Sequence, residues 1–363
     1  MNLFLSLKQR FSHHGIKDKI VTILWITFIW TLIRAFKFIE TYASKIDSAE
    51  FSEGMLSGIL IIIAAGLILG ASLVFLWERW LRKMAYLKAM FFILLFYSFV
   101  FFTFYFLEQV LTEVSKSNQS MAAPELKEVF NLTLLVNYIY WLVITFLTIL
   151  FLLIRDKFGP ITFVNFLKGK YLRPKREERI FMFMDLKSST TIAEQLGEER
   201  YFNFLNDTFS IATPAILATK GEIYQYVGDE IVISWITKNG LKRANCISCY
   251  YKMIMLLNDK FDFFDKKYGI QPQFKAGLHF GNVITGEMGI VKREIVYSGD
   301  VLNTASRIQS LCNEMNTEIL ISNDLINLIN LSFLNKKIKF IGNTNLRGKQ
   351  EKVELVTLVN INT

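Results

Sequence analysis

Cysteine is scarce in this sequence, which excludes a fold held together by a framework of disulfide bonds. The three cysteines, Cys246, Cys249 and Cys312, all lie in the C-terminal half of the 363 residues, and three cysteines cannot form such a framework. Cys246 and Cys249 have the C-x-x-C spacing of some redox and zinc sites, but no second cysteine pair or nearby histidine completes a zinc site. We therefore expect a buried or half-buried helical pair of free thiols.

Charged side chains are nearly absent from four long apolar runs before residue 155. Each run is close to the ~20 residues that a helix needs to cross a bilayer, and such runs rarely lack a polar face in water-soluble helices. The composition agrees, because 52% of the residues are hydrophobic and 33 are phenylalanine. The sequence predicts an N-terminal all-α membrane domain, residues 20–154, with four transmembrane helices at about 20–38, 56–77, 86–107 and 132–154.

Two further absences narrow the interpretation of this half. No small-residue cleavage site follows the first apolar run, which also starts too late for a secretory signal peptide. Ionisable side chains that would mark an ion path are missing from the interiors of the runs, which argues against a transporter or channel.

Lysine and arginine indicate which side of the membrane each loop faces. Basic residues gather in the N-terminal segment 1–19, in the second loop and after the fourth run, whereas the first and third loops are acid-rich. By the positive-inside rule, we expect a multi-pass protein of the cell inner (plasma) membrane with both termini in the cytoplasm. The same clusters account for much of the formal net charge of +9, so no nucleic-acid partner is expected.

A basic linker, residues 155–178, joins the two halves of the chain. Pro160 should end any continuation of the fourth helix. The basic cluster from Lys168 to Arg176 suits the anionic inner leaflet of the lipid bilayer, at ~1 kcal/mol per charge near the surface. A solvated run of charges explains the cluster equally well.

From residue 179 to residue 363 the pattern changes to alternating strands and helices, which predicts an α+β sheet domain. An apolar strand at 179–186 precedes a helical stretch at 188–220, where Ser188 to Thr191 offer N-caps. Residues 222–235 read as a hairpin around Gly228-Asp229. Later segments read as a helix at about 241–268, a strand and glycine-punctuated turn at 274–289, a strand and a helix near 294–313, and three late strands.

Two aspartates in this half carry the expected chemistry. Asp185 ends the apolar strand 179–186, and Asp229 sits in the turn of the hairpin. Mg²⁺ is typically bound by one or two carboxylates plus substrate phosphates, and two such ions can clamp a phosphoryl-transfer reaction. Strands that bring two carboxylates to one place therefore indicate a site of this kind. Taken singly, Asp229 could serve only the turn and Asp185 could cap the next helix.

Four short motifs occur in order along this half: F-x-D-x-x-x-S-T at 183–190, V-G-D-E at 227–230, G-L-H-F-G-x-V-x-x-G at 277–286 and G-D-x-x-N-x-A-S-R at 299–307. In this order and spacing they resemble the catalytic domain of class III nucleotidyl cyclases, the adenylate/guanylate cyclase family, over about residues 179–360. The resemblance implies a ferredoxin-like βαββαβ core with extra strands. It also implies an active site completed by both chains of a head-to-tail homodimer, where two Mg²⁺ or Mn²⁺ ions support conversion of ATP to 3′,5′-cyclic AMP and pyrophosphate.

The resemblance also assigns roles to single residues. Asp185 and Asp229 would bind the two ions, with help from the carbonyl of Leu186. Asn303 would orient the ribose, and Arg307, four residues on and so on the same helix face, would stabilise the charge that develops on the α-phosphoryl oxygens. The nucleoside triphosphate would also meet the helix start and one late basic residue, through Ser188, Ser189 and Thr190 and through Arg347 or Lys349.

Two positions depart from the family's pattern and concern the base. Gln225 stands where adenylate cyclases have a lysine, and Val296 stands where they have an aspartate or threonine. Gln225 can donate and accept hydrogen bonds and could still read adenine, whereas the Val296 side chain can do neither. Adenine is therefore expected from the family alone. Cyclisation of GTP or a pyrimidine nucleotide, or a degenerate nucleotide-binding regulator of the membrane domain, are the alternatives. His279 reads as a strand residue rather than a ligand.

Overall fold

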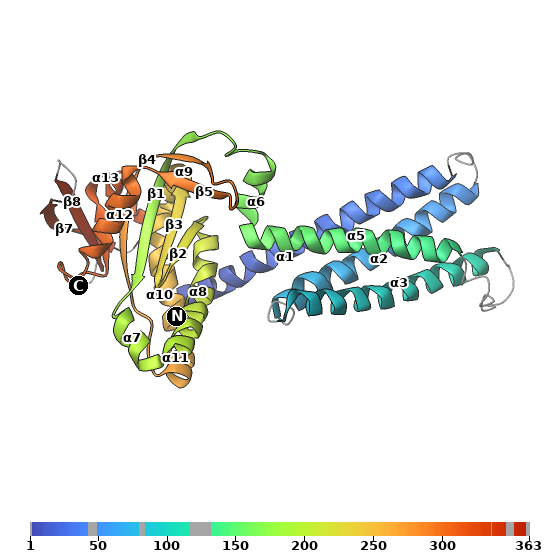
Figure 1. Ribbon diagram of the computed structural model, residues 1–363, viewed down its shortest axis with the longest axis horizontal. Coiled ribbons are helices and arrows are strands. Elements are labelled where there is room, and N and C mark those ends of the chain that lie inside the picture. Colours follow the sequence, from blue (N-terminus) through green and yellow to red (C-terminus); the bar gives the residue numbers. More distant parts are fainter. Residues whose placement is uncertain are drawn as a thin grey trace. The chain divides into compact units, whose positions relative to one another are not determined.

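The computed structural model describes residues 2–42, 49–79, 84–116, 132–334, 336–345 and 352–360 (Figure 1). The chain divides into two compact units, one formed by Ser12–Phe163 and the other by Val164–Thr363 with Met1–Phe11. The division falls inside the predicted linker, residues 155–178.

The first unit is built from long helices: α1 (Asn2–Tyr42), α2 (Ala49–Arg79), α3 (Tyr86–Lys116) and α5 (Leu132–Phe158). Within the described residues, three stretches are long and apolar enough to cross a membrane, Lys19–Glu40, Leu87–Leu107 and Leu132–Arg155. The second predicted span, 56–77, falls on α2, where the described apolar stretch runs only from Ile59 to Phe75. An apolar helical N-terminal region is thus confirmed, and its crossing of a membrane four times stays a prediction.

Aromatic and small residues pack these helices together. The rings of Trp30 and Trp141 lie 6.0 Å apart, and Trp30 Nε1 donates a hydrogen bond to Thr148 Oγ1 over 3.1 Å. A Cβ atom at Gly66 would lie 3.1 Å from Thr27 Cγ2, so α1 and α2 approach closely where glycine leaves room.

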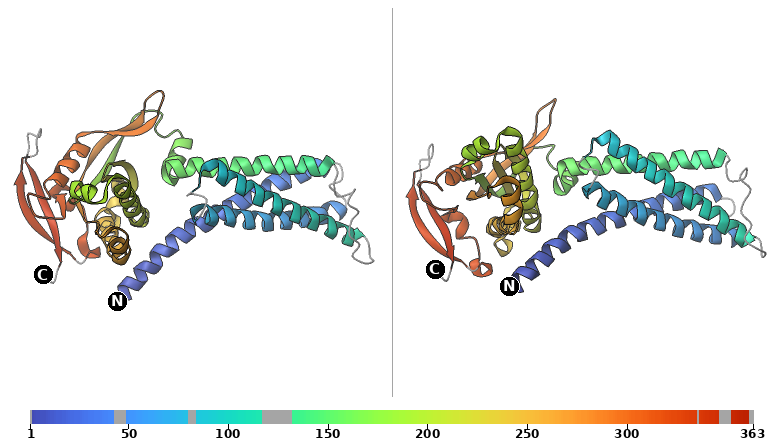
Figure 2. Two further views of the ribbon diagram at one scale, coloured as in Figure 1. Left: turned by 60° about the horizontal axis from the view of Figure 1, so that its bottom comes forward. Right: turned by 90° about the horizontal axis from the view of Figure 1, so that it is seen from below.

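The second unit contains one eight-stranded mixed sheet with the order β2-β3-β1-β4-β6-β8-β7, in which β5 pairs with β4. The strands are β1 (Lys175–Leu186), β2 (Glu222–Val227), β3 (Glu230–Ile236), β4 (Phe274–Met288), β5 (Glu294–Ser298), β6 (Ile319–Ser322), β7 (Lys336–Thr344) and β8 (Val353–Asn360). The hairpin of β4 and β5 extends beyond the rest of the sheet (orange, Figure 2).

Helices cover both faces of the sheet. They are α7 (Ser189–Leu196), α8 (Glu198–Ala218), α9 (Thr237–Leu241), α10 (Asn245–Asn258), α11 (Phe261–Tyr268), α12 (Asp300–Ser310) and α13 (Asn323–Ile326). The short helix α6 (Pro160–Leu167) precedes β1 in the chain. The order β2-β3-β1-β4 is antiparallel and includes α8 and α10 as connections, which is the ferredoxin-like βαββαβ arrangement. The predicted α+β fold with extra strands is confirmed.

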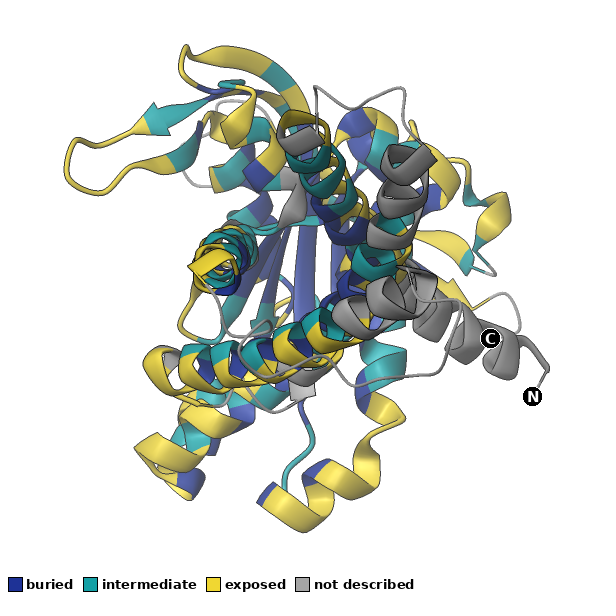
Figure 3. Ribbon diagram, turned by 90° about the vertical axis from the view of Figure 1, so that its right-hand side faces the viewer, coloured by how far each residue is buried: buried dark blue, intermediate teal, exposed yellow. Residues whose placement is uncertain are grey.

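Strand β1 lies inside this sheet, between β3 and β4, and its two faces pack against different parts of the domain. Successive strand residues point to opposite faces. Ile180, Met182 and Met184 enter the main core beneath α8 and α10, whereas Phe181 and Phe183 pack on the other face. The central strands are buried along most of their length (dark blue, Figure 3). Asp185 therefore emerges at the end of the second face, beside α12.

Cys246 and Cys249 lie buried on α10 and are free, as expected, and Cys312 is also buried and free. The predicted end of the fourth helix before Pro160 is likewise confirmed, because α5 stops at Phe158 and α6 starts at Pro160.

Three predicted elements were wrong in their extent. The helix at 188–220 breaks into α7 and α8 at Gly197, whose φ of 73° leaves the helical region. The helix at 241–268 becomes α9, a short 3₁₀ turn, α10 and α11, with Ala244 in the left-handed region. Residues 274–288 form one strand without a turn, because β4 pairs with β1 from Phe274 to Thr285 and this pairing keeps its glycines extended.

A glycine on β4 sets how closely α12 can approach the sheet. A Cβ atom at Gly277 would lie 2.2 Å from the backbone nitrogen of Gln309 and 2.6 Å from the carbonyl oxygen of Ala305. We expect Gly277→Ala to displace α12 and lower the free energy of unfolding by about 1–3 kcal/mol, the usual cost of overpacking. Chemical unfolding of the two proteins measures this. Gly286→Ala on the same strand is the control, since its Cβ would meet Pro174 only at 3.3 Å; equal effects of the two changes would contradict the prediction.

Candidate active site

Asp185 lies at the centre of a row of charged side chains across three strands. Its partners in the sheet are Glu230 on β3 and Lys275 on β4, so the three side chains leave the same face. Lys275 Nζ lies 3.5 Å from Asp185 Oδ2. Gln309, near the end of α12, donates a hydrogen bond from Nε2 to the same oxygen over 3.2 Å. The end of β1 is thus tied to α12.

Asp229 reaches this row from the turn between β2 and β3. Gly228 takes the left-handed conformation, with φ of 62°, that the two-residue turn requires. Burial, and then hydrogen bonding with the Asp229 carboxyl, raise the pKa of Asp185 to about 6. Burial and the charges of the two aspartates raise the pKa of Glu230 to about 7. The structure therefore brings the two predicted carboxylates together, and their role as metal ligands stays a prediction.

The donor set fits a hard divalent cation that shares its ligands with a substrate. All three acidic groups offer oxygen, and their mutual repulsion is what a cation would relieve. In the described part of the chain, no group of three or more His, Cys, Asp or Glu side chains could hold a metal ion without other ligands. This agrees with Mg²⁺ or Mn²⁺ bound by one or two carboxylates together with phosphate oxygens. The side chain of Leu186 is buried, so only its carbonyl could contribute.

The start of α7 follows Asp185 directly and offers backbone donors. Ser188 is the N-cap residue in a left-handed conformation and its side chain makes no capping hydrogen bond, so the predicted side-chain cap was wrong. The amides of the first turn, which begins at Ser189 and Thr190, therefore remain uncapped by Ser188. Such a helix start suits an anion.

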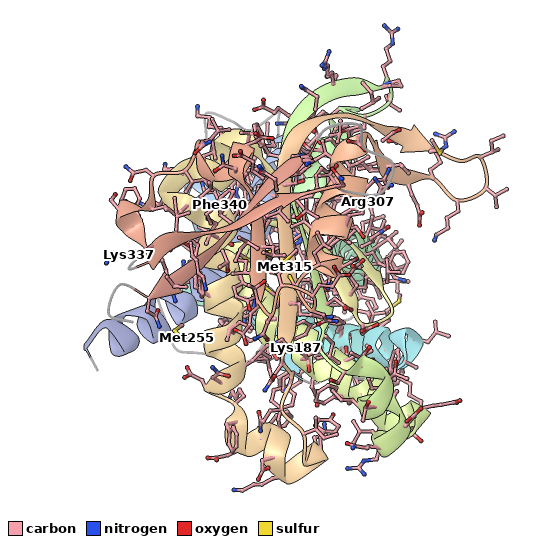
Figure 4. All side chains as sticks on the ribbon, turned by 90° about the vertical axis from the view of Figure 1, so that its left-hand side faces the viewer. Lys187, Met255, Arg307, Met315, Lys337 and Phe340 are labelled. Atoms are coloured by element: carbon pink, nitrogen blue, oxygen red, sulfur yellow. The ribbon has the colours of Figure 1, made fainter. Side chains whose placement is uncertain are left out.

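Helix α12 presents the predicted ribose and transition-state residues. Val301 and Ala305 pack against the phenylalanines of β1, which fixes the helix on this face of the sheet. Asn303 is exposed and Arg307 is half-buried. Figure 4 shows Arg307 well away from Lys187, the residue two positions after Asp185.

The two base positions lie on different strands, which are not neighbours in the sheet. Gln225 is exposed on β2 and Val296 is half-buried on β5. The residues next to them, Tyr224 and Tyr297, meet edge to face with ring centroids 4.8 Å apart. Arg347 and Lys349 lie outside the described residues.

Four residues near the site were not predicted from the sequence: Glu230, Lys275, Gln309 and Tyr201, whose pKa is raised by burial and by the charge of Asp229. Only strand register and helix packing reveal them. His279 is buried, and its Nδ1 lies 2.8 Å from Ser322 Oγ, which agrees with a structural role.

Residues 173–360, slightly more than half of the chain, match the family described as the adenylate and guanylate cyclase catalytic domain. The chain belongs to the adenylate and guanylate cyclase family. Within this family it is 32% identical over 205 residues to adenylate cyclase 2 of Rhizobium meliloti (strain 1021), covering 56% of each chain. It is 25% identical over 189 residues to an adenylate cyclase of Anabaena cylindrica, covering 48% of this chain and 35% of the relative. The chain thus spans about half the length, or less, of these curated cyclases.

The cyclase fold is also seen in solved structures. A bacterial light-regulated adenylyl cyclase superimposes on this chain with a TM-score of 0.53 and 20% identity, covering 63% of this chain and 66% of the other. At this identity the likeness concerns the fold alone.

The raised pKa of Asp185 predicts how the stability of the metal-free protein depends on pH. A folded pKa of about 6 against an ordinary 3.8 means that ionising Asp185 costs folding stability, a cost absent well below pH 4 and complete above about pH 6. The upper bound of this cost is about 3 kcal/mol. We expect about half of that value, because the side chain is 26% exposed and solvent screens part of the interaction. Asp185→Asn should therefore raise the unfolding free energy at pH 8 in EDTA, and less so at pH 5.

Unfolding of the full chain at both pH values measures this effect, with Asp265→Asn on the exposed side of α11 as the control. Added Mn²⁺ should then stabilise the unchanged protein and not the Asp185 variant. A variant that is less stable than the unchanged protein at pH 8 in EDTA would contradict the expected repulsion.

Proposed function

We propose that this protein is a membrane-bound nucleotidyl cyclase, a phosphorus–oxygen lyase that converts ATP to 3′,5′-cyclic AMP and pyrophosphate for signal transduction. The observation that carries the proposal is the convergence of Asp185 and Asp229 at the end of β1, within a domain of the adenylate and guanylate cyclase family.

Each predicted site residue has its own role in the proposed reaction. Asp185 and Asp229, with the carbonyl of Leu186, would hold two Mg²⁺ or Mn²⁺ ions. Such ions, when bound, lower the pKa of a ribose 3′-hydroxyl and neutralise a triphosphate. Asn303 orients the ribose so that its 3′-oxygen attacks the α-phosphorus, while the bond to the departing pyrophosphate breaks. Arg307 donates hydrogen bonds to the α-phosphoryl oxygens, where charge develops.

The remaining predicted contacts lie with the triphosphate. The first-turn amides of α7, at Ser188, Ser189 and Thr190, bind phosphate oxygens, because a helix start favours negative charge. Arg347 or Lys349 meets the terminal phosphates. Lys275 balances part of the carboxylate charge through its contact with Asp185.

The active form proposed is a head-to-tail homodimer. Its support is the family resemblance, together with the separation of Arg307 from Lys187 in one chain (Figure 4). In such a dimer the metal-binding carboxylates of one chain meet Asn303 and Arg307 of a second copy.

The apolar helices support a location in the cell inner (plasma) membrane. We propose that they cross the lipid bilayer as a multi-pass domain, with the N-terminus and the cyclase domain in the cytoplasm. The basic linker then lies beside the anionic inner leaflet, which attracts such charge.

Adenine is the proposed base because the two relatives described above are named adenylate cyclases. Gln225 and Val296 favour a second candidate, the cyclisation of GTP or a pyrimidine nucleotide, since Val296 cannot form the hydrogen bond expected at its position.

The first test is a product assay with the purified full chain in detergent. ATP, GTP, CTP and UTP are supplied in turn with Mg²⁺ or Mn²⁺, and cyclic product is identified by chromatography and mass spectrometry. We expect cyclic AMP from ATP, and EDTA should abolish it because the carboxylates then hold no metal. No cyclic product from any nucleotide would overturn the proposed function.

The second test separates the site from the fold. Asp229→Ala and Arg307→Ala should each lower kcat by about 100-fold or more, the usual effect of losing charge stabilisation at the reacting centre. Asp265→Ala and Arg293→Ala, at exposed positions, are the matched controls. Product formation that survives either site variant would exclude the assigned roles.

The third test concerns the base. Gln225→Lys combined with Val296→Asp restores the donor and acceptor of the adenylate cyclase pattern. Because one charged hydrogen bond contributes about 1.5–3 kcal/mol, we expect the ratio of kcat/KM for ATP to that for GTP to rise by about tenfold or more. An unchanged ratio would show that these two positions do not face the base.

A further inference from the structure

A fully buried arginine occupies the first half of β1, on the same face as Asp185. The Arg179 side chain has no exposed surface, and it contacts Glu177 Oε2 through Nε and Glu222 Oε2 through Nη1, each at 2.9 Å. Nη1 also donates to Ser234 Oγ at 2.9 Å. Well-packed apolar residues often stabilise a fold at least as well as a buried ionic network. The network is therefore better explained by a role in holding the surrounding side chains in a fixed geometry.

One side of this network is the segment through which the chain enters the catalytic unit. Lys170 Nζ lies 2.7 Å from Glu177 Oε1, so Glu177 is shared between Lys170 and Arg179. The Tyr171 hydroxyl accepts hydrogen bonds from Lys170 at 2.9 Å and from Arg179 at 3.4 Å. The amide of Glu287 on β4 donates to the Tyr171 carbonyl over 3.0 Å. The linker is thus anchored on Arg179.

The other side of the network faces the base positions. The guanidinium carbon of Arg179 lies 4.6 Å from the centre of the Tyr297 ring, and Tyr297 directly follows Val296. Tyr297 in turn meets Tyr224, which directly precedes Gln225. The pairing of β2 with β3 shifts register at Tyr224, and such a bulge re-aims the side chains beside it. Val296 is therefore next to a ring that contacts Arg179, and Gln225 is next to a ring that contacts Tyr297.

We propose that Arg179 is a positioning residue that couples the linker segment Lys170–Tyr171 to the base-facing residues Gln225 and Val296. This inference rests on the proposed nucleotidyl cyclase function and adds a point of control to the same site. A shift of Tyr171 changes how Glu177 is divided between its two cations, and Arg179 passes the change to the Tyr297 ring.

The coupling reaches the base positions rather than the metal ligands. Asp185 lies six positions after Arg179, about 20 Å along β1. Changes at Arg179 should accordingly alter nucleotide affinity and leave the metal dependence in place.

The decisive experiment compares Arg179→Gln and Arg179→Lys in the full chain in detergent, with Arg293→Gln at an exposed position as the control. KM and kcat for ATP are measured together with the Kd of a fluorescent ATP analogue. We expect Arg179→Gln to raise KM and Kd by about tenfold with kcat within about threefold, and Arg179→Lys to recover part of the affinity. A purely structural arginine would instead reduce the folded, active fraction, which lowers the apparent kcat and leaves KM and Kd unchanged; that result overturns the proposal.

A second variant keeps the test decisive if Arg179→Gln folds poorly. Tyr171→Phe removes one hydroxyl and no packing, and it should raise KM by about threefold in the unchanged background. In the Arg179→Lys background its effect should shrink, because coupled residues are non-additive. Full additivity in both backgrounds would overturn the coupling.

The two proposals fail in different ways. An unchanged protein that neither binds the analogue nor forms product refutes the cyclase function itself. An unchanged protein that does both, with variants of unaltered KM and Kd, refutes only the role of Arg179.

Discussion

The pairing of β1 on both edges is the constraint on which this domain depends. Hydrogen bonding to β3 on one side and β4 on the other leaves the strand no freedom to slip, and a slip by one residue would exchange its faces. From Ile180 to Leu186 the face towards α8 and α10 carries only apolar side chains and forms the main core. The opposite face holds Arg179 at one end, two phenylalanines in the middle and Asp185 at the other end. From Arg179 to Leu186, charge is thus confined to the ends of one face, with an apolar block between them.

Local chemistry allowed much of this arrangement to be predicted. The Gly228-Asp229 turn and the apolar run that ends at Asp185 are short-range signals, and the structure contains both as expected. Residues joined only by tertiary structure gave no such signal: Lys275 and Gln309 approach Asp185 from positions 90 and 124 residues further along the chain. The predicted ends of helices were wrong where a residue with a non-helical backbone conformation, such as Gly197, interrupts the helix.

The same limits apply to the function. The motif spacing placed Asn303 and Arg307 on one helix. In the proposed homodimer their contacts with a nucleotide depend on a second chain, which the spacing within one chain does not describe. Base preference is harder still to predict. The positions of Gln225 and Val296 depend on the adjacent residues Tyr224 and Tyr297, whose contact the local sequence does not predict. The bulge at Tyr224 illustrates the reason: one residue without a partner in the ladder changes which side chains converge.

The burial of the cysteines has a practical consequence for spectroscopy. Burial raises the pKa of the Cys246 and Cys249 thiols to about 12 and that of Cys312 to about 11, so little of the reactive thiolate exists at neutral pH. The natural chain can therefore serve as its own background for site-directed labelling. A single cysteine introduced at an exposed site such as Ile290, which is 93% exposed at the tip of the β4–β5 hairpin, would carry a spin or fluorescent label alone, with no native residue replaced to silence the rest.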